Sequence, residues 1–397
     1  MKKELLLFGM SLLLVLTACK DKKNKDDDGN SDPTKIGLAV SPWPCYSQNN
    51  QRTNISPNNS LPSANLKWSL DLGVWLRGLV IGPDGTLYVN GQKKVFAVNP
   101  DGTLKWSYDA GFFLSPCPVV GTNNRIYVNG YNTVNTFEYT GSVLCLSTDS
   151  GTVKWRFNSP DAVNGGFWSS PMIGLDGYLY VAEKMTKTLY ALDVNGSVNW
   201  SFIAAYDLVG APAIGSDSTI YLSAYQTSDG KGYLYAIRPG GTEKWKYSAN
   251  TLTEAVVGPT YLNIGIAGEM VWVTKAGVKK WNKTVPPGSV SSGFAVGKDA
   301  TVYFELNDGG TTYMRIHQDG LEKWYSDLFG GRYTITNDSK IYISKETSLI
   351  LFDIATKTKT WEYTYAGFVE NVTSPVVGTN GIVYIPAKNG MLYALGQ

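Results

Sequence analysis

The sequence predicts an all-β fold: an eight-bladed β-propeller of four-stranded antiparallel blades, whose last blade is closed by an N-terminal strand. Three observations predict it. Tryptophan recurs eight times at separations of 36 to 49 residues. Short apolar runs between these tryptophans are divided by Gly/Asp turns, and the first and last repeats are incomplete in complementary ways. The recurring residues are Trp68, Trp106, Trp155, Trp200, Trp245, Trp281, Trp324 and Trp361.

Each repeat contains enough short apolar runs for four strands. Segments such as 82–89 (GPDGTLYV) and 174–181 (GLDGYLYV) combine a Gly/Asp turn with a run rich in Val, Leu and Tyr. Runs of this length and composition, bounded by such turns, are typical of antiparallel strands joined by hairpins. Four strands in about 42 residues make one propeller blade. A glycine also stands four residues before six of the tryptophans, namely Gly102, Gly151, Gly196, Gly241, Gly277 and Gly320.

The two ends of the repeat region predict how the ring closes. Residues 375–397 contain three apolar runs and no tryptophan strand, whereas the first tryptophan strand, 65–71, has no three strands before it. Placing residues 65–71 at the outer edge of the last sheet pairs both incomplete parts and removes two open edges. We therefore expect one propeller over residues 64–397.

The N-terminal residues predict export and lipid anchoring. Residues 1–18 have a basic start and an apolar run of about twelve residues, too short to span a bilayer as a helix but typical of a signal peptide. The segment Leu16 to Cys19 (LTAC) resembles the lipobox of bacterial lipoproteins, which implies that Cys19 is acylated. We expect residues 19–40 to be a lipidated, disordered tether, since most of them are polar, and 41–63 a lead-in segment. Lys20 favours the outer membrane over inner-membrane retention.

Composition excludes several functional classes. Aromatic residues reach 13% and charged residues only 17%, which excludes a mostly disordered chain. The formal net charge of +2 gives no electrostatic footprint for nucleic acid. The single histidine, His317, excludes sites that need two, and we expect it to be solvated in a turn. Cys117 and Cys145 either form a disulfide or, like Cys45, remain buried thiols.

The repeat resembles the pyrroloquinoline-quinone-like (PQQ-like) β-propeller repeat, and with the lipobox the chain is similar to the BamB-type lipoproteins of outer-membrane protein assembly. The segments Ser41 to Pro44 and Gln51 to Pro57 resemble the stretch that often precedes such propellers, with Asn54 in place of the usual Gly. The resemblance implies a protein-interaction scaffold with envelope partners, and it implies no one activity because fold and function separate freely.

Quinoprotein dehydrogenases of this superfamily use adjacent cysteines, a calcium ion and an Asp base, and this chain has no Cys-Cys pair. The residues expected at the central funnel are mostly small and uncharged, with one carboxylate, so we expect neither a cofactor nor a metal. We also expect no catalytic residues and no enzyme activity. The expected funnel residues are Gly78, Cys117, Ser170, Ala211, Glu254, Gly293, Arg332 and Ser374.

The candidate binding residues lie in the loops that enter each blade, which should share one face of the disc. Aromatic side chains there either form an exposed surface for a protein or a glycan, or fill the wedges between blades. Arg77, Glu254 and Arg332 could orient a ligand, or Glu254 and Arg332 could form an ion pair. The aromatic candidates are Trp75, Phe112, Phe113, Phe167, Trp168, Tyr206, Phe329 and Phe368.

Three functions follow as hypotheses. The first is a non-catalytic, lipid-anchored envelope scaffold that binds proteins of outer-membrane assembly. The second is a surface lipoprotein that binds glycans through the loop aromatics. The third is a hydrolase or lyase with its site in the funnel, which is the weakest because acidic residues do not gather there.

Overall fold

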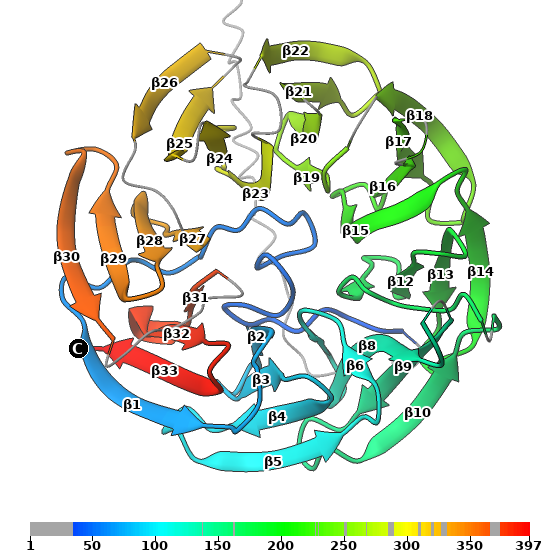
Figure 1. The fold of residues 1–397 in the computed structure, drawn as a ribbon, viewed down its shortest axis with the longest axis horizontal. Coiled ribbons are helices and arrows are strands. Elements are labelled where there is room, and N and C mark those ends of the chain that lie inside the picture. Colours follow the sequence, from blue (N-terminus) through cyan, green and yellow to red (C-terminus); the bar gives the residue numbers. More distant parts are fainter. Residues whose placement is uncertain are drawn as a thin grey trace, which may run out of the picture.

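The computed structural model describes residues 35–397 except 137, 162, 227, 229, 250–251, 267, 285–289, 309–310, 319–320, 327–331 and 366–373. These residues form eight antiparallel sheets arranged in a ring, so the predicted eight-bladed propeller is confirmed (Figure 1). No helix in the described part of the chain is long and apolar enough to cross a membrane.

Strands run outward from the centre within each blade, in chain order. The first four blades are β2 (Gly78–Ile81), β3 (Leu87–Asn90), β4 (Lys94–Val98) and β5 (Leu104–Asp109); β6 (Phe113–Leu114), β7 (Val119–Gly121), β8 (Arg125–Thr133), β9 (Tyr139–Leu146) and β10 (Val153–Asn158); β11 (Met172–Ile173), β12 (Leu179–Glu183), β13 (Thr188–Leu192) and β14 (Val198–Ile203); and β15 (Asp207–Ile214), β16 (Ile220–Gln226), β17 (Lys231–Ile237) and β18 (Glu243–Ala249). In the second blade the innermost position is divided between β6 and β7, which both pair with β8.

The remaining blades follow the same order, except that β1 is the outermost strand of the last blade although it precedes the other strands in the chain. They are β19 (Val256–Val257), β20 (Tyr261–Ile266), β21 (Glu269–Thr274) and β22 (Lys279–Thr284); β23 (Val290–Val296), β24 (Val302–Asp308), β25 (Thr311–Gln318) and β26 (Leu321–Ser326); β27 (Arg332–Ile335), β28 (Lys340–Ser344), β29 (Ser348–Asp353) and β30 (Thr358–Thr364); and β31 (Val376–Val377), a short 3₁₀ turn η1 (Thr379–Gly381), β32 (Val383–Pro386), β33 (Met391–Gly396) and β1 (Asn65–Asp71).

The ring closes as the sequence predicts. Strand β1 pairs antiparallel with β33, so that Asn65 lies opposite Gly396 and Asp71 opposite Met391. Strand β1, at the beginning of the propeller, is therefore the outermost strand of the sheet whose other strands are β31, β32 and β33 (Figure 1). This pairing leaves no gap between the first and last blades.

Tryptophans of the outer strands join each blade to the next one. The Trp68 indole Nε1 donates to the carbonyl oxygen of Pro100 at 2.9 Å, and Trp106 donates to that of Thr148 at 2.9 Å. Each ring also covers the turn glycine of the following blade: a Cβ on Gly102 would lie 2.7 Å from the Trp68 ring. The predicted structural role of the repeated Gly and Trp is thereby confirmed for these blades.

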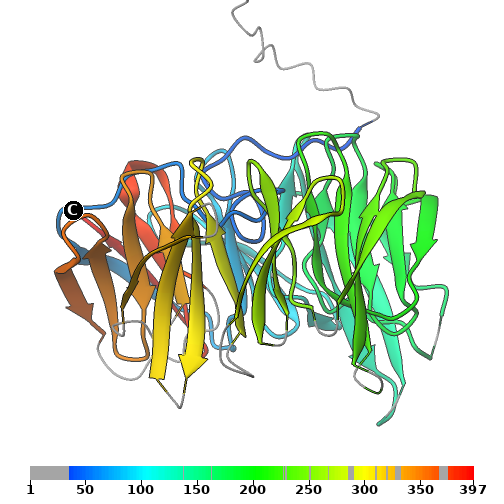
Figure 2. The same cartoon turned by 90° about the horizontal axis from the view of Figure 1, so that it is seen from above.

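The two faces of the disc differ. We call residues 35–63 the plug segment, because they cross the centre of the ring at one end of the channel (Figures 1 and 2). The face that carries this segment, together with the turns that follow the innermost strands, is the plug face. The opposite end, which carries the loops that lead from one blade to the next, is the loop face.

The plug segment is ordered further towards the N-terminus than the sequence suggests. The predicted tether extends to residue 40, yet Ile36 and Ala39 are buried, and Leu38 forms a β-bridge with Gly121. Packing against apolar side chains of the second and third blades explains the difference, because these two apolar residues find a partner surface that sequence composition does not reveal. Residues 1–34, with the predicted signal peptide and Cys19, lie outside the described residues.

Candidate binding site in the central funnel

The plug segment closes one end of the channel by bonding to blade after blade. Its backbone carbonyls accept hydrogen bonds from amides at the ends of the innermost strands, at 2.7 to 3.4 Å. Because these partners belong to six different blades, the segment and the ring hold one another in place. The donor and acceptor pairs are Ile81 with Trp43, Val120 with Pro44, Ile214 with Asn50, Val257 with Gln51, Val296 with Thr53 and Ile335 with Asn54.

The plug segment needs unusual backbone conformations to follow this path. Ser47, Gln48, Arg52 and Asn54 all have φ between 54° and 79°. Asparagine tolerates this left-handed region better than most residues, which explains why Asn54 can stand where related sequences have glycine. Its side chain adds a further bond, since Nδ2 donates to the carbonyl oxygen of Tyr333 at 2.9 Å.

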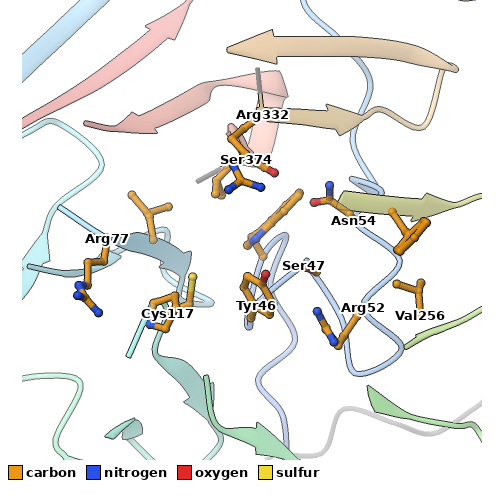
Figure 3. A pocket seen from close by; sticks show the side chains of 14 residues that line it. Tyr46, Ser47, Arg52, Asn54, Arg77, Cys117, Val256, Arg332 and Ser374 are labelled. Carbon is orange, nitrogen blue, oxygen red and sulfur yellow. The ribbon is translucent and has the colours of Figure 1, made fainter. Parts of the chain in front are cut away.

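A cavity of about 210 Å³ lies above this floor, between the plug segment and the innermost strands. Tyr46, Arg52 and Asn54 form its floor, and Arg77 and Arg332 lie on its walls (Figure 3). The other lining residues are Trp43, Ser47, Leu79, Pro116, Cys117, Val256, Phe294, Ser374 and Val376. The expected funnel residues Cys117, Arg332 and Ser374 are thus brought together here.

Arg52 is a buried ionic anchor of the floor. Its guanidinium forms an ion pair with Glu254, and Nη1 donates to the carbonyl oxygens of Ala211 at 3.0 Å and Ala255 at 3.4 Å. The Tyr46 ring lies 5.0 Å from the guanidinium carbon. Burial lowers the pKa of Arg52, but arginine starts high enough to stay charged. Of the charged candidates, Glu254 is therefore paired with Arg52 and not with Arg332.

The two wall arginines differ in how they are held. Arg77 is half-buried, its Nη1 donates to the carbonyl oxygen of Leu114 at 2.8 Å, and its guanidinium lies 6.0 Å from the Trp75 ring. Arg332 begins β27 and is exposed to solvent, and its side chain extends over the open part of the cavity (Figure 3). The Arg332 guanidinium therefore faces the cavity, whereas the Arg77 guanidinium lies at its edge and is turned toward Leu114 (Figure 3).

A second cavity of about 280 Å³ adjoins the first and shares Tyr46 and Pro116 with it. Trp168, Ser170, Lys184 and Leu208 are among its lining residues, together with Glu254, Ser169, Ala182, Val209 and Gly210. The predicted funnel residues Ser170 and Glu254 thus belong to this second cavity. Tyr46 and Pro116 thus stand between a cavity that Arg332 lines and one that Lys184 lines.

The loop aromatics divide between the two roles that the sequence left open. Phe112 and Phe167 are buried and pack between blades, with Phe167 against Phe157 and Tyr190. Trp75 remains 38% exposed. Phe113, Trp168 and Tyr206 are half-buried. Phe329 and Phe368 lie outside the described residues.

Trp168 belongs to an aromatic cluster whose rings already contact one another. Tyr131 and Tyr139 meet it edge to face at 5.4 and 5.3 Å between ring centroids, and the Lys184 ammonium lies 5.1 Å from the ring. Trp75 is likewise approached by Lys388 at 4.9 Å. A sugar that stacks on Trp168 or Trp75 would therefore compete with the neighbouring lysine for the ring.

Two expectations about single residues are settled by the structure. His317 is not in a solvated turn: it ends up in β25 with no exposed surface, 5.2 Å from the Phe304 ring and 5.9 Å from the Trp272 ring. Strand β25 extends to Gln318, and Trp272 of β21, in the preceding blade, packs beside the imidazole ring. Cys45, Cys117 and Cys145 are buried free thiols, so the alternative of a disulfide between Cys117 and Cys145 is wrong in this structure.

The residues present do not fit a calcium–quinone site. Among the described residues, no group of three or more His, Cys, Asp or Glu side chains is placed to hold a metal ion. Glu254, the one carboxylate of the two adjoining cavities, is already bound by Arg52. Calcium needs six to eight oxygen ligands, and this funnel offers guanidinium groups instead.

The plug segment is the part of the site that sequence reasoning missed. Trp43, Tyr46 and Arg52 were not among the candidate residues, although they form the floor of the cavity. The sequence feature that could have pointed to these residues is the resemblance of residues 41–63 to the stretch that often precedes such propellers. The path of that segment across the ring depends on hydrogen bonds to residues 38 to 281 positions away, which no local pattern contains.

Comparisons with known proteins agree with this architecture. A family model described as outer membrane protein assembly factor BamB matches residues 139–395. BamB from Moraxella catarrhalis is similar in structure, with 13% sequence identity, a TM-score of 0.64, and coverage of 84% of this chain and 100% of that chain. A search of the curated proteins found no match.

Two dehydrogenases are also similar in structure. A europium-containing methanol dehydrogenase has 11% identity and a TM-score of 0.65, with coverage of 92% of this chain and 99% of that chain. A quinohemoprotein alcohol dehydrogenase from Comamonas testosteroni has 13% identity and a TM-score of 0.69, with coverage of 89% and 80%. At such identities the likeness shows the fold alone.

Proposed function

The chain belongs to the family described as outer membrane protein assembly factor BamB, and from this premise we propose that it is a non-catalytic, lipid-anchored envelope scaffold that serves outer-membrane protein assembly. The observation that carries the proposal is the family match over residues 139–395, on a ring that closes without any additional domain in the described chain.

The chemistry of the funnel supports a binding role over a catalytic one. The described lining residues of the cavity carry guanidinium, hydroxyl and apolar groups, and they include no pair of carboxylates that could act as general acid and base. His317, the one histidine, is buried in β25 away from the cavity lining. A rigid ring with an open loop face is well suited to hold a partner protein in one orientation.

The position of the plug segment places the predicted anchor on one face of the disc. Acylation of Cys19 would attach the chain to the membrane through residues 20–34, and the first described residues lie on the plug face, where the Ile36 amide donates to Gly177. The loop face then points away from the anchored side. Partners would meet the funnel mouth and the exposed loop residues first.

Affinity capture tests the proposed partners. The full chain with a C-terminal tag is recovered from detergent-solubilised envelopes, and bound proteins are identified by mass spectrometry. We expect a β-barrel of the outer-membrane assembly machinery to be enriched over a capture with an unrelated tagged lipoprotein. Recovery of no such barrel under mild detergent would contradict the proposal.

The anchor is tested separately. Cys19→Ser removes the thiol that would be acylated, so we expect the protein to move from the membrane fraction to the soluble fraction. Cys45→Ser serves as the control, because Cys45 is buried in the plug segment and not near the predicted cleavage site. Unchanged membrane attachment of the Cys19 variant would show that another feature holds the protein there.

A further inference from the structure

We propose that the mouth of the funnel binds an acidic segment of a protein partner, and that Arg77 and Arg332 recognise its carboxylates. This inference rests on the proposed scaffold function and names the kind of surface that a partner presents. It concerns the two adjoining cavities, one lined by Arg332 and the other by Lys184.

The charge of the cavity is the first reason. Among the described residues that line the cavity of about 210 Å³, three are arginines and none is acidic. The Arg52 charge is compensated by Glu254, so two uncompensated charges remain: Arg332, whose guanidinium faces the cavity, and Arg77 at the edge of the cavity (Figure 3). Two positive charges in a concave, partly desolvated site attract an anion more strongly than the same charges on a flat surface.

The geometry of the guanidinium groups is the second reason. Arg77 uses Nη1 for the carbonyl oxygen of Leu114, which fixes the side chain and leaves its other N–H groups for a ligand. Arg332 extends over the cavity from the start of β27 (Figure 3). Planar guanidinium groups bind carboxylates through paired hydrogen bonds, which is why the proposed ligand is a carboxylate.

The floor is rigid, and that makes the site selective. Arg52, held by Glu254 and by two backbone carbonyls, cannot rearrange without leaving a buried charge unpaired. The plug segment lies across the opposite end of the channel, so we expect a ligand to enter from the loop face. A cavity of about 210 Å³ suits one or two side chains and not a folded domain.

The second cavity favours a polypeptide over a free anion. It lies on the other side of Tyr46 and Pro116, and it adds the apolar side chains of Ala182, Leu208 and Trp168 beside Lys184. A small polycarboxylate would fill only the arginine-lined cavity. A chain with an acidic residue followed by apolar residues would use both cavities.

Fluorescence anisotropy with labelled peptides tests the proposal. The probe is a short peptide in which Asp and Glu alternate with apolar residues, and its twin carries Asn and Gln in their places. Binding is measured for the parent chain, Arg77→Gln, Arg332→Gln and the double variant. Arg238→Gln is the matched control, an exposed arginine outside the cavity whose Nη1 donates to the Glu243 carbonyl oxygen at 2.6 Å.

We expect saturable binding of the acidic peptide only, with Kd raised at least about tenfold, equivalent to about 1.4 kcal/mol, in the double variant and unchanged in Arg238→Gln. Since Arg332 is exposed, its variant should fold even if Arg77→Gln does not. Equal binding of both peptides, or equal affinity of the parent and Arg332→Gln, would overturn the proposal. Saturable binding of citrate with none of the peptide would also overturn it, because the ligand would then be a free anion.

The affinity capture separates this inference from the scaffold function. If the double variant still recovers the assembly barrel as well as the parent does, the funnel is not the docking site although the scaffold function stands. If the parent binds the acidic peptide but recovers no barrel, the site stands and the proposed function fails.

Discussion

Single glycines decide how closely neighbouring blades approach. Gly241 has φ of 82°, and a Cβ there would lie 2.7 Å from the Trp200 ring, a distance that real contacts do not reach. Its neighbour Gly240 has nothing within 4 Å of an added Cβ. Two adjacent glycines of the same turn therefore differ completely in what they can tolerate.

Gly241→Ala should lower the free energy of unfolding by about 1–3 kcal/mol, because alanine is strained at positive φ and displaces the Trp200 ring. Gly240→Ala should change it by less than about 0.5 kcal/mol. Urea denaturation followed by tryptophan fluorescence measures both. Equal effects of the two substitutions would show that the contact between glycine and indole does not hold the blades together.

Buried thiols make the protein sensitive to alkaline pH. Burial raises the pKa of the Cys117 thiol from its ordinary value of 9.0 to about 12. The unfolded chain therefore releases this proton first as the pH rises. The stability that the neutral thiol confers is complete below pH 9 and is lost as the pH approaches 12.

In Cys117→Ala this loss should disappear. The difference in unfolding free energy between the parent and the variant should shrink by roughly 2 kcal/mol between pH 8 and pH 10.5. Denaturation of both proteins in reducing buffer across this range measures the difference. A difference that stays constant with pH would mean that Cys117 is solvated in the folded state.

Among the elements, the plug segment (residues 35–63) contacts the largest number of different blades through its hydrogen bonds to their innermost strands. Arg52 contributes strongly to these contacts, because its charge is buried and its partners Glu254, Ala211 and Ala255 belong to the fourth and fifth blades. The segment has little regular structure of its own. Its position depends on these contacts with the blades.

Arg52→Ala should lower the free energy of unfolding by about 3 kcal/mol, since it leaves the largely buried Glu254 without its partner. Arg238→Ala, which removes an exposed arginine, should cost less than about 0.5 kcal/mol. Chemical denaturation compares the two. The proposed role of Arg52 would be wrong if both variants unfolded at the same urea concentration.

For the whole molecule, closure of the ring is the decisive event. β1 and β33 come from opposite ends of the propeller and pair along their lengths, from Asn65 opposite Gly396 to Asp71 opposite Met391. A ring without this pair would expose one edge of β33 and leave the Trp68 contact with Gly102 unmade.

Replacing residues 65–71 with a flexible Gly/Ser linker of equal length should therefore destabilise the protein by at least about 3 kcal/mol. Attaching residues 64–72 after Gln397 through a short turn should restore most of the loss, because Asn65 already lies beside Gly396. Thermal unfolding of the three proteins provides the comparison. A linker variant that melts with the parent would refute closure by β1.

Local patterns were enough to predict the blades. The recurring Gly, Trp and Asp-Gly or Asn-Gly turns contact residues that are neighbours in sequence or belong to the next repeat. The same local interactions therefore recur in each copy and favour the same blade structure. The incomplete repeats at both ends also predicted the β1–β33 pair. His317 was misplaced because the length of a hairpin and its burial depend on the adjacent blade.

What the sequence determined by itself was the repeated unit, the number of blades and the way the ring closes, because each follows from short-range patterns that recur. The site itself depends on the tertiary structure: Arg52 meets Glu254, and Arg52 and Arg332 come to line one cavity, after the plug segment has crossed the finished ring. These contacts join residues more than 200 positions apart in the chain. These residues come together only when the eight blades have formed the ring, so no single segment of the sequence predicts the contacts between them.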